Sequence, residues 1–276
     1  MKNQSVIIIA VIALLVGAAI AWVAKPTGVV EEVGKFAEAP TAGKTITLIH
    51  GLDAAYPPWT QVTEEGEIEG FDVDMVIWIR DWLNENTENT WVIEHKPYPW
   101  EGIFVALKEG KLDLIASGAT IIAEEQEIVL FGMPYFSYHM NIVVAEDTTL
   151  SLEEILESGG SLVCQLGTDS EIMVDQLIEE GHNVKKLALE SYPLALEAIK
   201  DGRAIAGVSD SAVTVPLFKK PQFAGLKELT AIGGPKVFSV ATKWEDRWLY
   251  EQINYAIYDF MGSPEYREYL LKWEII

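Results

Sequence analysis

The sequence predicts an α/β protein in which two lobes follow an N-terminal apolar segment. Three observations predict this fold. Strand-like and helix-like patterns alternate after residue 44, as in proteins with a mainly parallel sheet. A unit of helix, glycine and apolar strand occurs at 106–116 and again at 198–208. The chain has 276 residues, of which 49% are hydrophobic, so two modest cores can be formed and filled.

The first 25 residues are predicted to be a membrane anchor. The run 6–24 carries no charge, and at ~1.5 Å per residue it nearly spans a hydrocarbon layer of about 30 Å. A signal peptide cleaved near the small-x-small pattern Ala19-Ile20-Ala21 is the alternative. Residues 26–44 are predicted to be a linker. The rest of the chain is expected outside the cytoplasm, anchored to the cell membrane, or secreted or periplasmic if the segment is cleaved.

The first half of the exported part alternates between strands and helices. The expected order is strand 45–49, helix 71–83, strand 91–93, helix 103–108 and strand 112–116. Pro57 and Pro58 exclude helix from the loop after the first strand, and Asp72 suits the start of the first helix. This order is typical of a mainly parallel sheet.

The second half contains an echo of the first. Residues 106–111 recur as 198–203, and each copy is followed by an apolar strand. The strands end in polar tips, Ser117-Gly118 and Ser209-Asp210, which indicates two similar lobes. The alternative is a chance repeat, because an acidic-glycine-basic sequence is a common helix stop. If the lobes are similar open sheets, a ligand is expected where the carboxyl ends of their strands meet.

Composition excludes several partners and sites. The formal net charge of −22 would be repelled by phosphate backbones, so we expect no nucleic-acid partner. Cys164 is the single cysteine and lies in an apolar stretch, which favours a buried small hydrophobe over a reactive thiol. The four histidines lie far apart in the sequence, so we expect no metal site. No cofactor is expected.

Short segments at these tips and turns identify a family when taken together. They are DAAYPPW at 53–59, GFDVD at 70–74, WEG at 100–102, LDLIASGAT at 112–120, PYF at 134–136, QLGT at 165–168 and VSDS at 208–211. In this order and spacing the chain resembles the extracellular solute-binding proteins of family 3, which deliver polar amino acids to ABC transporters. The resemblance covers about residues 45–274.

The resemblance implies a two-lobed, type II periplasmic-binding-protein fold with a hinge. Residues 45–140 would form the first part of lobe 1. Residues 141–240 would form the hinge crossings and lobe 2, and residues 241–276 would return to lobe 1.

The resemblance also implies a ligand site between the lobes. Its expected residues are Asp53, Tyr56, Trp59, Trp100, Ser117, Gly118, Thr120, Glu125, Tyr135, Gln165, Thr168 and Asp210. In this family pattern Tyr56 and Trp100 would clamp the ligand, and Asp210 would hold its α-ammonium group. These roles are physically sensible, because a desolvated cation needs a fixed carboxylate and favours aromatic faces.

Glu125 departs from the family pattern, which has an arginine at this position for the ligand's α-carboxylate. Two interpretations follow. Glu125 and Asp210 could face the cleft together and bind an amine or other cation without a carboxylate. Alternatively, Glu125 could turn to solvent while amide N–H groups near Thr120 and Thr168 hold the ligand's carboxylate.

The expected function is capture of a small polar amino acid or amine for an ABC permease. The protein would act as a monomer and close about its hinge on the ligand. A ligand sensor for a separate signalling partner is the alternative, and a dehydratase-like enzyme on the same fold is another. We expect no enzyme, because the sequence contains no G-x-S-x-G nucleophile elbow and no further domain after the binding module.

Overall fold

The computed structural model describes residues 34–276, which form one compact unit. The predicted anchor or signal segment, 1–25, and the first part of the predicted linker lie outside the described residues. Within residues 34–276, no helix has the length and apolar character needed to cross a membrane.

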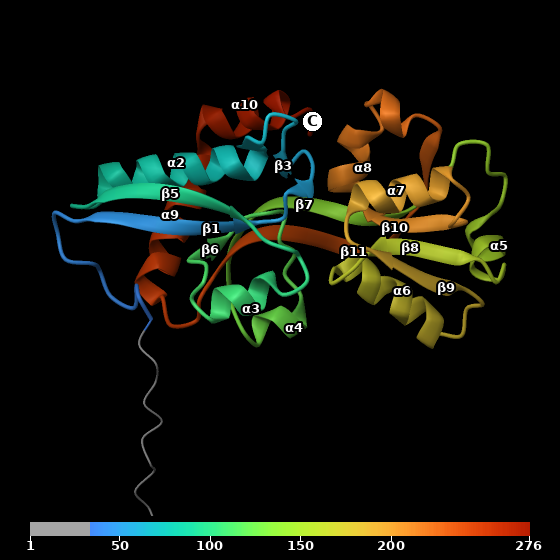
Figure 1. The fold of residues 1–276 in the computed structure, drawn as a ribbon, viewed down its shortest axis with the longest axis horizontal. Coiled ribbons are helices and arrows are strands. Elements are labelled where there is room, and N and C mark those ends of the chain that lie inside the picture. The colour runs from blue at the N-terminus through green and yellow to red at the C-terminus, as the bar shows by residue number, and fades with distance from the viewer. Residues whose placement is uncertain (1–33) are drawn as a thin grey trace, which may run out of the picture. The chain divides into compact units, whose positions relative to one another are not determined.

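A sheet of eight strands runs through this unit (Figure 1). Its order is β5 (Thr90–Pro97), β1 (Thr45–Leu52), β6 (Leu114–Ile115), β11 (Leu226–Thr242), β7 (Leu130–Ala145), β10 (Ala206–Asp210), β8 (Ser161–Gln165) and β9 (Lys185–Leu189). A second, small sheet contains β2 (Ala55–Tyr56), β3 (Thr60–Val62) and β4 (Ile68–Glu69). The second sheet was not expected from the sequence, because strands of two or three residues leave no periodic pattern.

Helices cover both faces of the large sheet (Figure 1). They are α2 (Phe71–Asn86), α3 (Ile103–Lys108), α4 (Ala123–Gln126), α5 (Leu152–Leu156), α6 (Asp169–Glu179), α7 (Tyr192–Lys200), α8 (Ser211–Leu217), α9 (Arg247–Gly262) and α10 (Pro264–Lys272), with a 3₁₀ turn, η1 (Pro221–Phe223). The α/β prediction is therefore confirmed.

The large sheet consists of two parallel sets of strands joined by a long antiparallel pair. We call β5, β1 and β6 the first strand set, and β9, β8 and β10 the second. The joining pair is β7 and β11, and each of these strands belongs to both halves of the sheet. Met140 of β7 already pairs with Asp210 of β10, whereas Thr242 of β11 pairs with Leu114 of β6. The two strands are thus the central link between the sets, and the predicted lobe boundaries remain predictions.

The repeated unit occupies a corresponding place in each set. Helix α3 ends before Gly110 and leads into β6, while α7 ends before Gly202 and leads into β10. Both glycines adopt positive φ, 72° and 73°, the left-handed conformation in which glycine ends a helix without steric cost. The strand β6 is shorter than the predicted 112–116, and β10 begins two residues later than the predicted 204–208.

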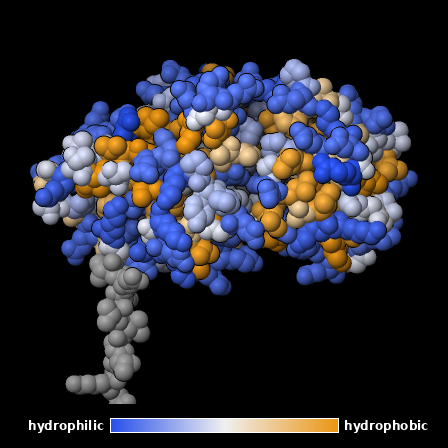
Figure 2. Space-filling view, in the orientation of Figure 1, coloured by the Kyte–Doolittle hydropathy of each residue, from blue (hydrophilic) through white to orange (hydrophobic). Residues whose placement is uncertain are grey.

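Buried aromatic rings fill the junction between the two strand sets. Phe238 of β11 lies 4.9 Å from the ring of Trp59 and 6.3 Å from the ring of Tyr135, measured between centroids. All three side chains are almost fully buried. Cys164 is also buried, in β8, and burial raises the pKa of its thiol to about 12. The face drawn in Figure 2 is mostly hydrophilic with scattered hydrophobic residues, as its acidic composition predicts.

Candidate ligand-binding site

A cavity lies between the two strand sets, at the carboxyl ends of their parallel strands. Its lining residues are Asp53, Tyr56, Trp100, Ser117, Gly118, Thr120, Ile122, Gln165, Thr168, Asp169, Tyr192 and Asp210. Asp53 follows β1, Ser117 follows β6, and Gln165 and Asp210 end β8 and β10. Because parallel strands present their carboxyl ends at one edge, residues far apart in sequence meet here.

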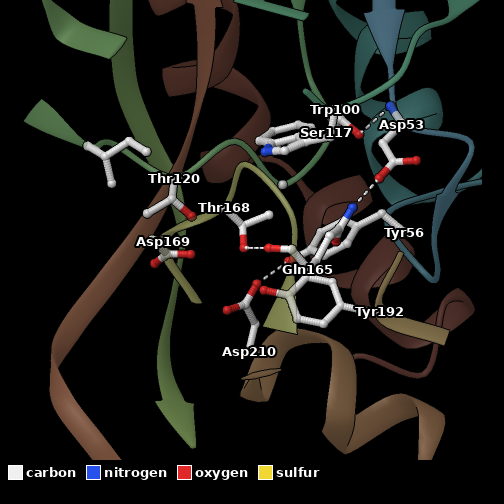
Figure 3. A pocket seen from close by; sticks show the side chains of 12 residues that line it. Asp53, Tyr56, Trp100, Ser117, Thr120, Gln165, Thr168, Asp169, Tyr192 and Asp210 are labelled. Atoms are coloured by element: carbon white, nitrogen blue, oxygen red, sulfur yellow. Dashed lines mark hydrogen bonds between the residues drawn. The ribbon is translucent and has the colours of Figure 1, made fainter. Parts of the chain in front are cut away.

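Hydrogen bonds across the cavity hold the two halves together (Figure 3). The Tyr56 hydroxyl donates to Asp210 Oδ2 at 2.7 Å, and Gln165 Nε2 donates to Asp53 Oδ2 at 2.8 Å. Trp100 Nε1 donates to the Gly167 carbonyl at 3.0 Å. The cavity has about 20 Å³ of room, which is enough for a water molecule but not for an amino acid. This conformation is therefore closed, and a solute can enter only if these contacts open.

Aromatic rings form two walls of the cavity. Tyr56 is 5% exposed and packs against Tyr192, with ring centroids 5.4 Å apart. Gly118 lies directly against the Tyr56 ring. A Cβ at this position would come within 2.2 Å of Tyr56 Cε1, and its φ of 56° also favours glycine. Gly118 therefore allows the backbone to approach the ring closely.

Three buried carboxyl groups line the cavity. Asp210 is 3% exposed, Asp169 is 4% exposed and Asp53 is 8% exposed. No basic side chain lines the cavity anywhere in residues 34–276. The cavity is therefore strongly acidic for its size.

Burial is the main influence on the ionisation of these carboxyl groups. It raises the pKa of Asp210 well above its usual range, and the neighbouring charge of Asp169 raises this pKa further. Burial also raises the pKa of Asp169, against the opposing effect of Lys236, whose Nζ lies 3.7 Å from Asp169 Oδ2. The pKa of Asp53 is raised by burial as well. A cation placed among these carboxyl groups would stabilise their ionised form.

Two buried acceptor atoms in the cavity wall have no hydrogen-bond partner within the described part of the chain. They are Asp210 Oδ1 and Gln165 Oε1. Leaving such atoms unpaired costs about 1–3 kcal/mol each, so a donor in the cavity would find two acceptors ready. The hydroxyl groups are mostly engaged: Thr168 Oγ1 donates to the Gln165 carbonyl at 2.8 Å, and Thr120 Oγ1 lies 2.6 Å from the Tyr138 hydroxyl.

The structure places most of the residues predicted from the sequence around this cavity. They are Asp53, Tyr56, Trp100, Ser117, Gly118, Thr120, Gln165, Thr168 and Asp210. Trp59 and Tyr135 lie elsewhere, in the core behind the cavity. Trp59 Nε1 donates to the Ala212 carbonyl at 2.9 Å, and the Tyr135 hydroxyl donates to Asp72 Oδ2 at 2.9 Å. Their polar atoms are thus used within the protein.

Glu125 does not line the cavity, but it is not fully turned to solvent either. It lies in the short helix α4, half-buried, and its Oε2 atom is buried without a hydrogen-bond partner in the described residues. Burial raises its pKa to about 7, and the charges of Glu124 and Asp169 add to this rise. Glu125 therefore belongs to the electrostatic surroundings of Asp169.

Three lining residues were not predicted from the sequence: Ile122, Asp169 and Tyr192. Asp169 directly follows the predicted Thr168, so its position next to that residue was an available signal. Tyr192 begins α7 and belongs to no segment of the recognised pattern. It reaches the cavity because α7 packs against β8 and β10, which brings its ring onto Tyr56.

Comparisons with known proteins identify a matching family and a similar curated protein. The family model described as "Bacterial extracellular solute-binding proteins, family 3" matches residues 48–275. A probable histidine-binding protein of Neisseria gonorrhoeae is 26% identical over 243 residues, which cover 87% of each chain.

Solved structures extend the similarity to the fold. An ancestral arginine-binding protein bound to arginine has a TM-score of 0.73 and 31% identity, covering 82% of this chain and 97% of that chain. AncCDT-1, an ancestral amino acid-binding protein and precursor of cyclohexadienyl dehydratase, has a TM-score of 0.73 and 27% identity, covering 82% and 95%. The predicted two-lobed, periplasmic-binding-protein-like fold is thereby confirmed.

Proposed function

Because the chain belongs to the bacterial extracellular solute-binding proteins of family 3, it is a solute-binding component of ABC-type uptake, and we propose that its solute is a cation bearing an amino group. One observation carries the proposal. Three buried carboxyl groups line the cavity, and no basic side chain in residues 34–276 lines it with them. The ancestral arginine-binding protein holds a solute of this charge class.

Asp210 is proposed to accept the solute's ammonium group. Its Oδ1 atom has no partner within the described chain, and its Oδ2 atom accepts a hydrogen bond from the Tyr56 hydroxyl. An incoming cation would supply the donors and the positive charge that this buried carboxyl lacks. The rings of Tyr56 and Trp100 present faces that attract a cation once water is excluded.

Solute binding is proposed to bring the two strand sets together around the solute, with a cavity wider than the one in this conformation. Contacts such as Tyr56 to Asp210 and Asp53 to Gln165 form only when the two halves come together. β7 and β11 are the strands that link the halves, so we place the hinge in them. A solute bridging both halves would stabilise closure, and the permease would recognise that closed form.

The remaining expectations about this chain are proposals too. We propose that residues 1–25 anchor the protein at the outer face of the membrane, and that it works as a monomer. We also propose that it binds its solute without chemical conversion, although the similarity to a dehydratase precursor makes a turnover assay worthwhile. Incubation with each bound solute, followed by mass spectrometry, would recover the solute unchanged.

A thermal-shift screen of the full chain in non-ionic detergent tests the proposal. The panel contains L-arginine, L-lysine, L-histidine and their decarboxylated amines. L-glutamate is the acidic comparison, and L-leucine is the comparison with an uncharged side chain. A solute that binds only the folded state raises the melting temperature by mass action. We expect stabilisation by one or more cations and none by L-glutamate. Stabilisation by L-glutamate or L-leucine alone would contradict the proposal.

A further inference from the structure

We propose that the solute carries no carboxylate, because the side of the cavity beside Thr120 and Asp169 is built to receive a second cationic group. This inference rests on the proposed function and narrows its substrate class. The solute would be a small diamine-like molecule with nitrogen donors at both ends. Figure 3 shows the geometry, with Asp53 on one side of the cavity, Asp169 on the other and Asp210 below them.

The side at Asp169 has more acidic groups than its single cation can balance. Asp169 and Asp210 line the cavity there, and Glu125 lies close enough behind Asp169 for their charges to interact. Among the described residues, Lys236 of β11 is the only basic side chain within 4.0 Å of Asp169, and none lies within that distance of Asp210. One ammonium group therefore lies beside Asp169, while Asp210 and Glu125 have no ion-pair partner within residues 34–276.

Lys236 is also only loosely paired. Its Nζ lies 3.7 Å from Asp169 Oδ2, which is longer than a hydrogen bond, while the Tyr138 hydroxyl donates to the same oxygen at 3.1 Å. A solute carboxylate at this position would be a fourth acidic group among buried carboxyls. Desolvating like charges together is strongly unfavourable, whereas an ammonium group would relieve the existing repulsion.

Unpaired acceptors at this side favour a donor rather than another acceptor. Asp210 Oδ1 and Glu125 Oε2 are buried atoms without a hydrogen-bond partner in the described chain. Asp210 is 97% buried and lines the cavity. A carboxylate in the cavity could not satisfy Asp210 Oδ1, because it has no N–H or O–H to donate when ionised. Glu125 does not line the cavity and contributes only its charge. A protonated amine donates up to three hydrogen bonds and fits the deficit.

The opposite side of the cavity repeats this chemistry. Asp53 is buried there, and its Oδ2 atom accepts a hydrogen bond from Gln165 Nε2 at 2.8 Å. Gln165 Oε1 is a buried acceptor without a hydrogen-bond partner in residues 34–276. Both sides thus offer acceptors and negative charge, so a molecule with a cationic group at each end matches the cavity better than a zwitterion.

Isothermal titration calorimetry on the full chain in detergent tests this with three matched pairs: agmatine and L-arginine, cadaverine and L-lysine, and histamine and L-histidine. The members of each pair differ only in the carboxylate. In every pair that binds, we expect the amine to bind at least tenfold more tightly. If the amino acid binds equally well or better, the inference is overturned and Lys236 becomes the candidate receptor for its carboxylate. If none of the six binds, the proposed function itself fails.

Variants at Glu125 and Asp169 test whether these carboxyl groups cause the preference for the amine over the amino acid. Glu125→Gln and Asp169→Asn each remove one negative charge, so we expect each to reduce the preference for the amine by about fivefold or more. Glu127→Gln removes the same charge from an exposed position after the same helix and should leave the preference unchanged. Circular dichroism checks that Asp169→Asn folds. If this variant does not fold, Glu125→Gln provides an independent test, because Glu125 is only half-buried. A preference unchanged by Glu125→Gln and by a folded Asp169→Asn would overturn the inference.

Discussion

Replacing Asp210 by asparagine should weaken solute binding and at the same time stabilise the solute-free protein. Asparagine keeps the shape of the side chain, and its carbonyl oxygen can still accept the hydrogen bond from Tyr56. What it removes is the negative charge of a carboxyl group that is 97% buried. The two effects have opposite signs, which separates a binding role from a purely structural one.

The size of the binding effect follows from the contact that is lost. A hydrogen bond to a charged group contributes about 1.5–3 kcal/mol. Because ~1.4 kcal/mol is a factor of ten in affinity, Asp210→Asn should raise Kd about 10- to 100-fold. The stability effect arises because burial and the charge of Asp169 both oppose ionisation of Asp210. We expect the free energy of unfolding to rise by about 1–2 kcal/mol. Because each kcal/mol corresponds to ~2–4 °C in a domain of this size, Tm should rise by about 2–8 °C.

Titration calorimetry and solute-free thermal unfolding measure both effects on the same sample. Asp201→Asn is the matched control, since this exposed residue follows α7 and loses the same charge. The control should change neither Kd nor Tm appreciably. A Kd for Asp210→Asn within twofold of the unmodified protein, or a lowered Tm, would refute the reasoning about this carboxyl group.

Three further predictions address the surroundings of the cavity. Gly118→Ala should lower the free energy of unfolding by about 2–4 kcal/mol, measured by urea titration, because its Cβ would meet the Tyr56 ring at positive φ. Burial raises the pKa of Asp72 from 3.8 to about 7, so this carboxyl group stays protonated to higher pH in the folded state than in the unfolded state. The free energy of unfolding therefore falls as pH rises from about 4 to 7. Asp72→Asn should therefore reduce that fall, by about 3 kcal/mol between pH 4.5 and 7.5, in urea titrations at pH 4.5, 6 and 7.5; an unchanged fall would refute this. Cys164 should react with a thiol reagent only after denaturation, and rapid labelling of the folded chain would contradict its burial.

The sequence by itself determined the order of the elements and the edge of the sheet at which the cavity lies. Periodicity, prolines and glycine stops are local signals, so the helix after Gly70 and the two helix-glycine-strand units were predictable. Asp53, Ser117, Gln165 and Asp210 could be expected together because the carboxyl ends of parallel strands meet at one edge.

The tertiary structure alone decided which side chains at that edge reach the cavity. Trp59 and Asp53 come from the same loop, yet Trp59 packs on Phe238 in the core while Asp53 faces Gln165. Tyr192 reaches the cavity only through the packing of α7, and Asp169, Glu125 and Lys236 become neighbours only because α6, α4 and β11 converge. Such contacts depend on the directions of side chains and on how two halves of a sheet close on each other. Neither is encoded in a local pattern, because each depends on residues far away in the chain.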